Sequence, residues 1–582
     1  MATKREFHLG GIGGPSEVFQ RSVSRRSLLA GSAAGAAALA GRLDAIAATG
    51  GAKALGGRVL HQEIEPGGTL TYGLSFDVDG TLDPGVTHFD STIRITLNVC
   101  EPLVWMPSAT EIVPGLAETW EVSEDGLEYT FHLRQGVTFH DGTPFNAQAV
   151  QFTYDRIVEA DKIAAEGGSP DPEAVIVAGQ AHDQIGTYDH SEIIDDYTIK
   201  MVLSRPFSPF LTGLNGYLGI VSPTAVQEMG LGEFARKPIG TGPYMISEWV
   251  EADHVTIVRN PSYNWGSSFF QNQGAPYFDE IVYKFIPDPA VRTGTLLSGE
   301  TQYIDERDPL QAEDITGGGE AEIVRQAQPG SGWVVLINLS RPDRPVADLN
   351  VRKALHYAVD KDAFNEAVFA GTNEPASSPL MKVTFGYDPA TEGLYTYDPA
   401  MAAQLLEEAG WVLNGDIREK DGQKLELYYP IIDRPRDNAM ATFLQGAWRE
   451  VGVDIRVDPM ERGLYIQTWQ QENNYDFSFM WFSYADPDVL RTIFYSKNIG
   501  AFNRAQYNVP EVDKMLEDAA ASSVAEERLA LYSQIQLRVL EEAVVIPLAD
   551  SITYNAKQTR LQGEILDFLS SYVWMNSAHF AE

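Results

Sequence analysis

The order in which strand patterns and helix patterns follow one another constrains the fold of this chain most. In residues 116–145, apolar side chains alternate with polar ones on both sides of the turn sequence SEDG, which predicts a β-hairpin. Residues 192–207 show the same pattern and predict a second hairpin. From residue 333 onward, strand patterns such as WVVLINLS alternate with helical spacing, first in residues 350–360. Strand pairs combined with strand–helix units predict lobes of mixed α/β structure.

Capping residues mark the ends of two predicted helices. Asp288 and Asp398 each precede a proline, and an aspartate there can accept a hydrogen bond from the first turn of a helix. Gly299 and Gly410 follow the apolar pattern of the same two segments. A glycine can adopt the left-handed conformation in which many helices end, so each segment has both a predicted start and a predicted stop.

Composition excludes several classes of function. The chain has 582 residues, which alone predicts about three or four domain-sized units. The 43 Lys and Arg residues face 81 Asp and Glu residues, giving a net charge of -38, so little cationic surface remains for nucleic acid or an anionic membrane. Cys100 is the one cysteine, which excludes an internal disulfide and a four-cysteine metal site. Its apolar neighbours predict a small buried side chain.

The N-terminal residues carry an export pattern. Paired arginines in SRRSLL, residues 24–29, precede a weakly apolar run at residues 28–40 and a small-x-small sequence at residues 45–47. This pattern resembles a twin-arginine signal, so residues 1–47 are predicted to be a cleaved signal peptide. The run is shorter than the roughly 20 apolar residues that span a bilayer. Since no cysteine lies at the cleavage site, the mature protein is predicted to be periplasmic without a lipid anchor.

The first strand of the mature chain is predicted in residues 67–76. Leu70, Tyr72, Leu74 and Phe76 occur at every second position there, which places the four side chains on one face of a half-buried strand.

The sequence DVDGT, residues 77–81, follows this strand and matches the nucleophile motif of haloacid-dehalogenase-type phosphatases. In such an enzyme Asp77 would attack phosphorus and Asp79 would transfer the proton. A phosphatase also needs an acidic pair that binds a metal, but the acidic residues of EIIDDYT, 192–198, continue directly into the second hairpin. We therefore interpret DVDGT as a turn, with a secreted phosphatase as the alternative from another functional class. Other catalytic motifs are missing, so the chain is predicted to be neither an enzyme nor a cofactor protein.

Seven segments together resemble one protein family, the extracytoplasmic solute-binding proteins of family 5, which serve peptide- and nickel-type ABC importers. They occur in the family's order and cover most of residues 67–550. The segments are GLAETWEVSEDGLEYTFHLRQGVTFHDGTPFNAQAV, PIGTGPY, IPDPAVRTGTLLSGE, LNVRKALHYAVDKDAF, YDPAMAAQLLEEAGW, AWREVGVDI and YADPD.

The resemblance implies a bilobal α/β periplasmic-binding-protein fold, type II and cluster C-like, with an extra domain in the first lobe. The first domain of the first lobe would combine residues 66–98, 212–325 and 541–582. Residues 99–211 would form the second domain of that lobe, and residues 326–540 would form the other lobe. Two crossing strands would be the hinge, and the lobes would close on a solute. The implied partner is an ABC permease with its ATPase, and the protein is expected to be a monomer.

The resemblance places the end of the aromatic strand, in WFSYADPDVL, at the solute cleft. Trp481 and Tyr484 are therefore predicted to contact a solute, with packing in the core as the alternative. Asp486 is interpreted as a turn residue. In dipeptide-binding relatives an aspartate three residues before DPD neutralises the α-amino group of the peptide. Ser483 occupies that position here, which removes the usual ion pair.

Arg434, in IIDRPRDN, matches an arginine that pairs with the solute carboxylate in dipeptide-binding relatives, and a surface ion pair is the alternative. An arginine without the partnering acid favours an anionic or zwitterionic solute. His88 and Phe89, in the loop after the first strand, and Trp333, near the expected hinge, complete the predicted site. We rank a peptide-like solute first, an oligosaccharide or opine-type compound second and a nickel chelate last. A sensory or chaperone-like use of the same fold stays open.

Overall fold

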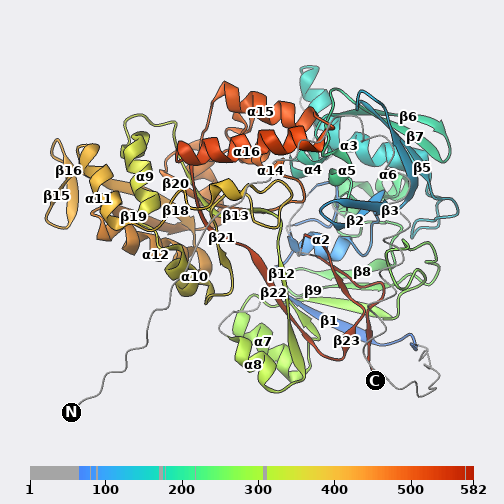
Figure 1. Cartoon of the computed structure of the whole chain (residues 1–582). Coiled ribbons are helices and arrows are strands. Elements are labelled where there is room, and N and C mark those ends of the chain that lie inside the picture. Colours follow the sequence, from blue (N-terminus) through green and yellow to red (C-terminus); the bar gives the residue numbers. More distant parts are fainter. Residues whose placement is uncertain are drawn as a thin grey trace, which may run out of the picture. The chain divides into compact units, whose positions relative to one another are not determined.

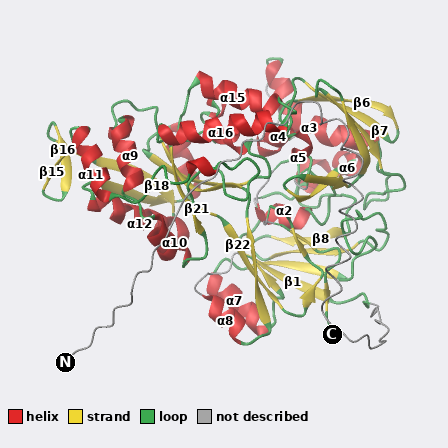
Figure 2. Ribbon diagram, viewed as in Figure 1, coloured by secondary structure: helices red, strands yellow, loops and turns green. Residues whose placement is uncertain are grey.

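The structure is a computed structural model that describes residues 64–581 except 79, 87–89, 169–174, 177–178, 216–217, 306–310 and 570–571. Three larger β-sheets and the helices around them make up most of this part (Figures 1 and 2). The predicted signal peptide lies outside the described residues. Among the described residues, no helix is both long enough and apolar enough to cross a bilayer.

The first sheet has the predicted first strand near its centre. Its order is β12 (Ala321–Ala327), β22 (Ile552–Gln558), β11 (Tyr303–Ile304), β1 (Thr69–Leu74), β10 (Glu280–Phe285), β9 (His254–Arg259) and β8 (Tyr244–Val250). The helices that follow or precede these strands are α2 (Asp90–Thr96), α6 (Pro223–Phe234), α7 (Pro289–Ser298) and α8 (Ala312–Gly317). Leu70, Tyr72 and Leu74 are buried in its core, as predicted. The prediction for Phe76 is wrong: β1 ends at Leu74 and the chain bends, so the Phe76 side chain is 37% exposed.

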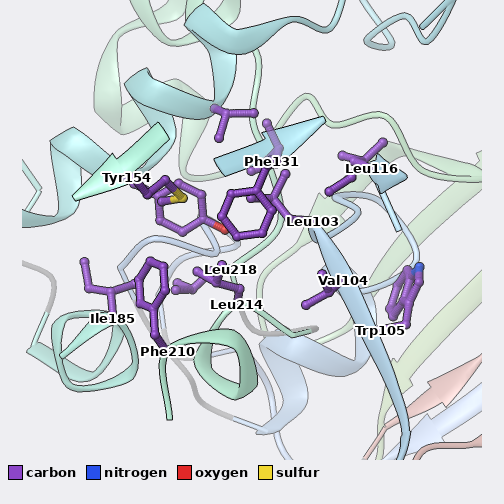
Figure 3. Close-up of a cluster of buried hydrophobic side chains, with 14 of the residues drawn as sticks. Leu103, Val104, Trp105, Leu116, Phe131, Tyr154, Ile185, Phe210, Leu214 and Leu218 are labelled. Atoms are coloured by element: carbon purple, nitrogen blue, oxygen red, sulfur yellow. The ribbon is translucent and has the colours of Figure 1, made fainter. Parts of the chain in front are cut away.

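The second sheet contains both predicted hairpins. Its order is β4 (Ala117–Val122), β5 (Glu128–Leu133), β7 (Thr198–Leu203) and β6 (Tyr188–Asp195), all antiparallel. The nearby elements are β2 (Val104–Ser108), β3 (Glu111–Pro114), α3 (Ala147–Ala165), α4 (Gly179–Ile185) and α5 (Phe210–Gly213). Figure 3 shows the core of this part, where Phe131 from β5, Tyr154 from α3 and Phe210 from α5 come together.

The third sheet is buried on both faces. Its order is β14 (Glu374–Pro375), β21 (Val545–Asp550), β13 (Gly330–Ile337) and β20 (Phe477–Ser483). A separate parallel pair, β18 (Glu426–Ile432) and β19 (Asp454–Met460), lies next to β20. One face packs on α9 (Leu349–Tyr357), α10 (Lys361–Phe369), α11 (Pro399–Glu408) and α12 (Pro435–Glu450). The other face packs on α14 (Val489–Phe494), α15 (Pro510–Ala521) and α16 (Ala525–Glu541). Successive residues of β13 therefore enter different cores: Val335 the first, Val334 and Leu336 the second.

The predicted caps are confirmed. Asp288 Oδ1 accepts hydrogen bonds from the backbone N–H groups of Ala290 and Val291, both at 2.9 Å. The backbone at Gly299 is left-handed, with φ 81°, and α7 ends there. Asp398 begins α11 in the same way, and Gly410 has φ 86°. Cys100 is buried, as its apolar neighbours predict. Smaller elements are β15 (Val412–Asn414), β16 (Ile417–Lys420), β17 (Gln423–Lys424), α13 (Arg462–Ile466), β23 (Leu561–Gln562), β24 (Ile565–Leu566), β25 (Val573–Trp574) and β26 (His579–Phe580).

Two strand connections join the first sheet to the third. The chain passes from β12 to β13 at Gln328 and Pro329, and it returns from β21 to β22 at Ser551. These connections are bonded to each other: Gln328 N donates to Ser551 O at 3.0 Å, and Ser551 Oγ donates to Gln328 Oε1 at 2.6 Å. Two adjacent crossing strands match the expected hinge. Because β21 belongs to the third sheet, that sheet extends to Asp550, past the boundary expected at residue 540.

Candidate functional site

The predicted residues of β13 and β20 meet close to the two crossing strands. Gly330, the first residue of β13, is the register partner of Ser483, the last residue of β20. Ser483 Oγ donates to the backbone carbonyl of Leu569 at 3.0 Å. Leu569 packs in the core around the second sheet. The end of β20 therefore lies where the third sheet meets the other part of the chain.

Trp333 and Trp481 form a stacked pair. Their ring centroids are 5.6 Å apart and the planes differ by 13°. Trp333 is 7% exposed, and its ring also lies 6.1 Å from that of Phe369 in α10. Trp481 is half-buried at the edge of the same core. The structure therefore brings together two residues that the sequence predicted separately, and one of them keeps an accessible side.

Arg436 belongs to this group, although the sequence did not predict it. It lies in the first turn of α12, and its guanidinium carbon is 4.3 Å from the centroid of the Trp333 ring. The Nε atom of Arg436 and the Nε1 atom of Trp481 are both buried, and neither has a hydrogen-bond partner among the described residues. A lone arginine next to a matching Arg-Pro pair carries no local signal. Only the packing of α12 against β13 reveals its position.

Arg434 forms an ion pair, which is the predicted alternative to solute binding. It occupies the N-cap of α12, and its Nε and Nη2 atoms donate to Asp437 Oδ2 at 3.2 and 2.8 Å. The Arg434 side chain is 41% exposed, whereas the Asp437 side chain is 6% exposed. Contact between Arg434 and a solute stays a prediction.

Tyr484 and Asp486 point into packed structure. Tyr484 is 8% exposed and packs in the core on the α14 to α16 side of the third sheet, opposite Trp333. Asp486 Oδ1 accepts from the backbone N–H of Asp488 at 2.9 Å, which is the expected turn contact, and from Arg528 Nη2 at 2.7 Å. Strand alternation explains the difference, since Trp481 and Ser483 face one way and Tyr484 the other. Contact between Tyr484 and a solute stays a prediction.

Two further predicted residues, His88 and Phe89, lie outside the described residues. In the sequence that resembles the phosphatase motif, Asp79 also lies outside the described residues. The Asp77 carboxylate accepts hydrogen bonds from backbone N–H groups. Asp77 Oδ1 accepts from Val78 N at 2.6 Å, and Oδ2 accepts from Ala252 N at 2.8 Å, beside the β8–β9 turn. In the described part of the chain, no group of His, Cys, Asp and Glu side chains is placed to hold a metal ion. These contacts give Asp77 a structural role.

A separate cavity of about 380 Å³ opens at the start of α10. Lys361 lines it and donates from Nζ to the carbonyl of Ala376 at 2.8 Å. Desolvation of this amino group lowers the pKa of Lys361 to about 8. None of the predicted site residues lines this cavity, so it is distinct from the group around Trp333.

Comparison with known proteins extends the similarity over most of the chain. Residues 111–502 match the model of the bacterial extracellular solute-binding proteins, family 5. The dipeptide-binding protein of Escherichia coli is 29% identical over 515 residues, which cover 84% of this chain and 90% of the relative. The crystal structure of NikA from Brucella suis with Fe(III)-EDTA has a TM-score of 0.76 and 28% identity, covering 88% of this chain and all of NikA.

The DppA structure from Helicobacter pylori with the peptide STSA has a TM-score of 0.73 and 25% identity, covering 88% of this chain and 99% of DppA. These structures are bilobal periplasmic binding proteins, which is the fold that the resemblance implied. The family match spans well over half of the sequence, and the two crossing strands between the first and third sheets agree with it. The chain therefore belongs to the bacterial extracellular solute-binding proteins of family 5.

Proposed function

We propose that this protein is the solute receptor of an ABC importer and that it captures a peptide or a peptide-like compound. In this proposal, one lobe contains the first and second sheets. It comprises residues 66–98, 99–211 and 212–325 together with the C-terminal segment. The third sheet with its helices forms the other. The loaded receptor delivers its solute to a membrane permease that works with an ATPase.

Family membership is the observation that carries this proposal. The similar proteins include a dipeptide-binding protein and a receptor solved with a peptide, which supports a peptide-type solute. Members of this family bind and transfer a solute, so we assign no chemical step to the chain. The backbone contacts of Asp77 are consistent with that assignment.

Closure about the two crossing strands supplies the mechanism. A solute that contacts both lobes has higher affinity for the closed form, and this difference shifts the population toward it. Gln328 and Ser551 tie the two connections together, so the lobes rotate about one short segment rather than about independent linkers. A closed receptor then presents to the permease a surface that the open form lacks.

Trp481, which stacks on the buried ring of Trp333, forms the solute-facing wall of the second lobe in this proposal, with Ser483 at its edge. Stacked indole rings offer a large apolar surface and restrict the orientation of a bound group. His88 and Phe89, in the loop after β1, are proposed to contribute from the first lobe. The N-terminal arginine pair directs export by the twin-arginine route, so the mature receptor acts in the periplasm without a lipid anchor.

Native mass spectrometry of the mature protein purified from a bacterial periplasm tests the proposed solute. We expect a co-purified peptide-type compound that is released unaltered on unfolding. Small-angle scattering of the stripped protein should show compaction when that compound is restored. An oligosaccharide or opine-type compound in the spectrum would replace the peptide assignment. A chemically altered solute, or scattering that does not change on binding, would contradict the receptor mechanism.

A further inference from the structure

Arg436 combines a positive charge with a buried donor that lacks an acceptor. Its guanidinium lies over the Trp333 ring, and its Nε atom is buried without a hydrogen-bond partner in the described part of the chain. The cation–π contact offsets part of the cost of desolvation. It does not satisfy the N–H groups, because these point outward in the plane of the guanidinium. Arg436 therefore keeps donors that a planar anion can occupy.

Trp481 adds a second donor beside the same ring. Its indole stacks on Trp333, and its buried Nε1 atom has no acceptor among the described residues. Both unpaired groups are donors, so the complementary group on a solute is an acceptor. A carboxylate fits best, since it accepts several hydrogen bonds and neutralises the charge of Arg436.

The neighbouring residues Arg434 and Ser483 already have partners within the protein. Two donors of Arg434 bind Asp437, whose carboxylate is almost fully buried. Asp437 therefore already neutralises the charge of Arg434, so the remaining donors of Arg434 give a solute carboxylate less electrostatic stabilisation than a guanidinium without an ion-pair partner. Ser483 has no charge, and its hydroxyl group donates to Leu569. Hence neither residue reproduces the ion pairs of a dipeptide receptor.

We infer that Arg436, rather than Arg434, receives a carboxylate of the solute. The solute class is then a peptide-like acid whose carboxylate lies next to an apolar group that covers the Trp481 ring. Its amino end is not held by an ion pair at Ser483, so N-blocked peptides are included. This inference rests on the proposed function and adds the anchor and the charge of the ligand to it.

The test uses a pooled library of di- to pentapeptides, each synthesised as the free acid and as the C-terminal amide. The mature protein retains peptides from this pool, and mass spectrometry gives the ratio of acid to amide for each sequence. For the wild type we expect a ratio of about 30, as befits a charge-assisted hydrogen-bonded contact. Arg436→Gln should lower the ratio to about 1, and Arg436→Lys should give an intermediate value.

Arg434→Gln separates the two arginines. We expect it to keep the high acid-to-amide ratio while lowering thermal stability, because Asp437 loses its partner. Arg449→Gln, on the exposed side of α12, is the matched control for loss of an arginine from this helix. A ratio near 1 in the wild type, or one abolished by Arg434→Gln but not by Arg436→Gln, would overturn the inference and leave the receptor function intact. Failure of the wild type to retain any peptide would overturn both the inference and the assignment of a peptide-type solute.

Discussion

Burial raises the pH at which Glu101 loses its proton, so that this side chain stays protonated at pH values where exposed glutamates are ionised. Its carboxylate accepts hydrogen bonds from Tyr263 Oη at 2.6 Å, from Trp265 Nε1 at 2.9 Å and from Thr241 Oγ1 at 2.9 Å. Desolvation outweighs these donors and raises the pKa of Glu101 from 4.5 to about 7. Between these two values the folded protein holds a proton that the unfolded chain has lost, so the free energy of unfolding falls as pH rises through this window.

In the wild type, Glu101 should lower the free energy of unfolding by about 3 kcal/mol between pH 4.5 and 7, and we expect Glu101→Gln to remove this change. Urea unfolding of the wild type and the variant across this range measures the difference. Glu118→Gln, whose parent side chain on β4 is 56% exposed, is the control and should follow the wild type. Parallel profiles for the wild type and Glu101→Gln would show that Glu101 is ionised in the folded protein.

Single residues also show how far sequence reasoning reaches. Arg434 was identified because it matches an Arg-Pro pair, yet the structure binds its guanidinium to Asp437. Arg436 was missed because its position depends on Trp333, which is remote in sequence. A pattern can identify a charged side chain near a cleft. Which of two neighbouring arginines keeps unpaired donors is decided by tertiary packing.

Among the elements, locally encoded features were predictable and long-range pairings were not. The hairpins of the second sheet and the caps of α7 and α11 follow from residues close together in sequence. The parallel pairing of β1 with β10 joins segments that share no local pattern. The hydrogen bond between Gln328 and Ser551 likewise joins segments that share no local pattern. The crossing strands could be expected only from the family resemblance, because hydrophobic periodicity contains no information about partners.

The loop after β7 forms a second contact between the two parts of the chain, on α14 and the C-terminal end of α15. Ser208 N donates to the carbonyl of Ala520 at 2.7 Å, and Ser208 Oγ donates to the carbonyl of Ser522. Phe207 lies under the guanidinium of Arg491, with 5.2 Å between the guanidinium carbon and the ring centroid. Figure 1 shows α15 and α16 extending from the third sheet toward the helices around the second. This contact stabilises the arrangement in which the two parts touch.

Ala520→Glu tests whether this contact opens when the solute leaves. Ala520 is 6% exposed, so a charge there disfavours the contact by desolvation, and we expect solute affinity to fall about tenfold through a smaller closed population. The unfolding midpoint of the solute-free protein should change little. Ala521→Glu, at an exposed neighbouring position, is the matched control for added charge. Unchanged affinity together with a strongly lowered midpoint would show that the contact is permanent packing.

At the scale of the whole molecule, the net charge of -38 opposes the capture of an anion. Long-range repulsion acts on the rate of encounter, whereas the short contact with Arg436 acts on the bound state. The range of the repulsion is set by salt: the Debye length falls from about 30 Å at 0.01 M to about 8 Å at 0.15 M. Salt should therefore raise the association rate constant of an acidic solute and leave its dissociation rate constant nearly unchanged.

Stopped-flow binding of one retained peptide in two charge forms measures this effect. The N-acetylated acid carries a negative charge, and we expect its association rate constant to rise about threefold between 0.01 and 0.15 M salt. The C-terminal amide with a free amine carries a positive charge, and its association rate constant should fall over the same range. Opposite slopes for the two forms identify the field of the whole protein as the cause, since a general salt effect on closure would move both in the same direction. Association rate constants of both forms that do not change with salt would mean that the acidic surface lies too far from the cleft entrance to influence capture.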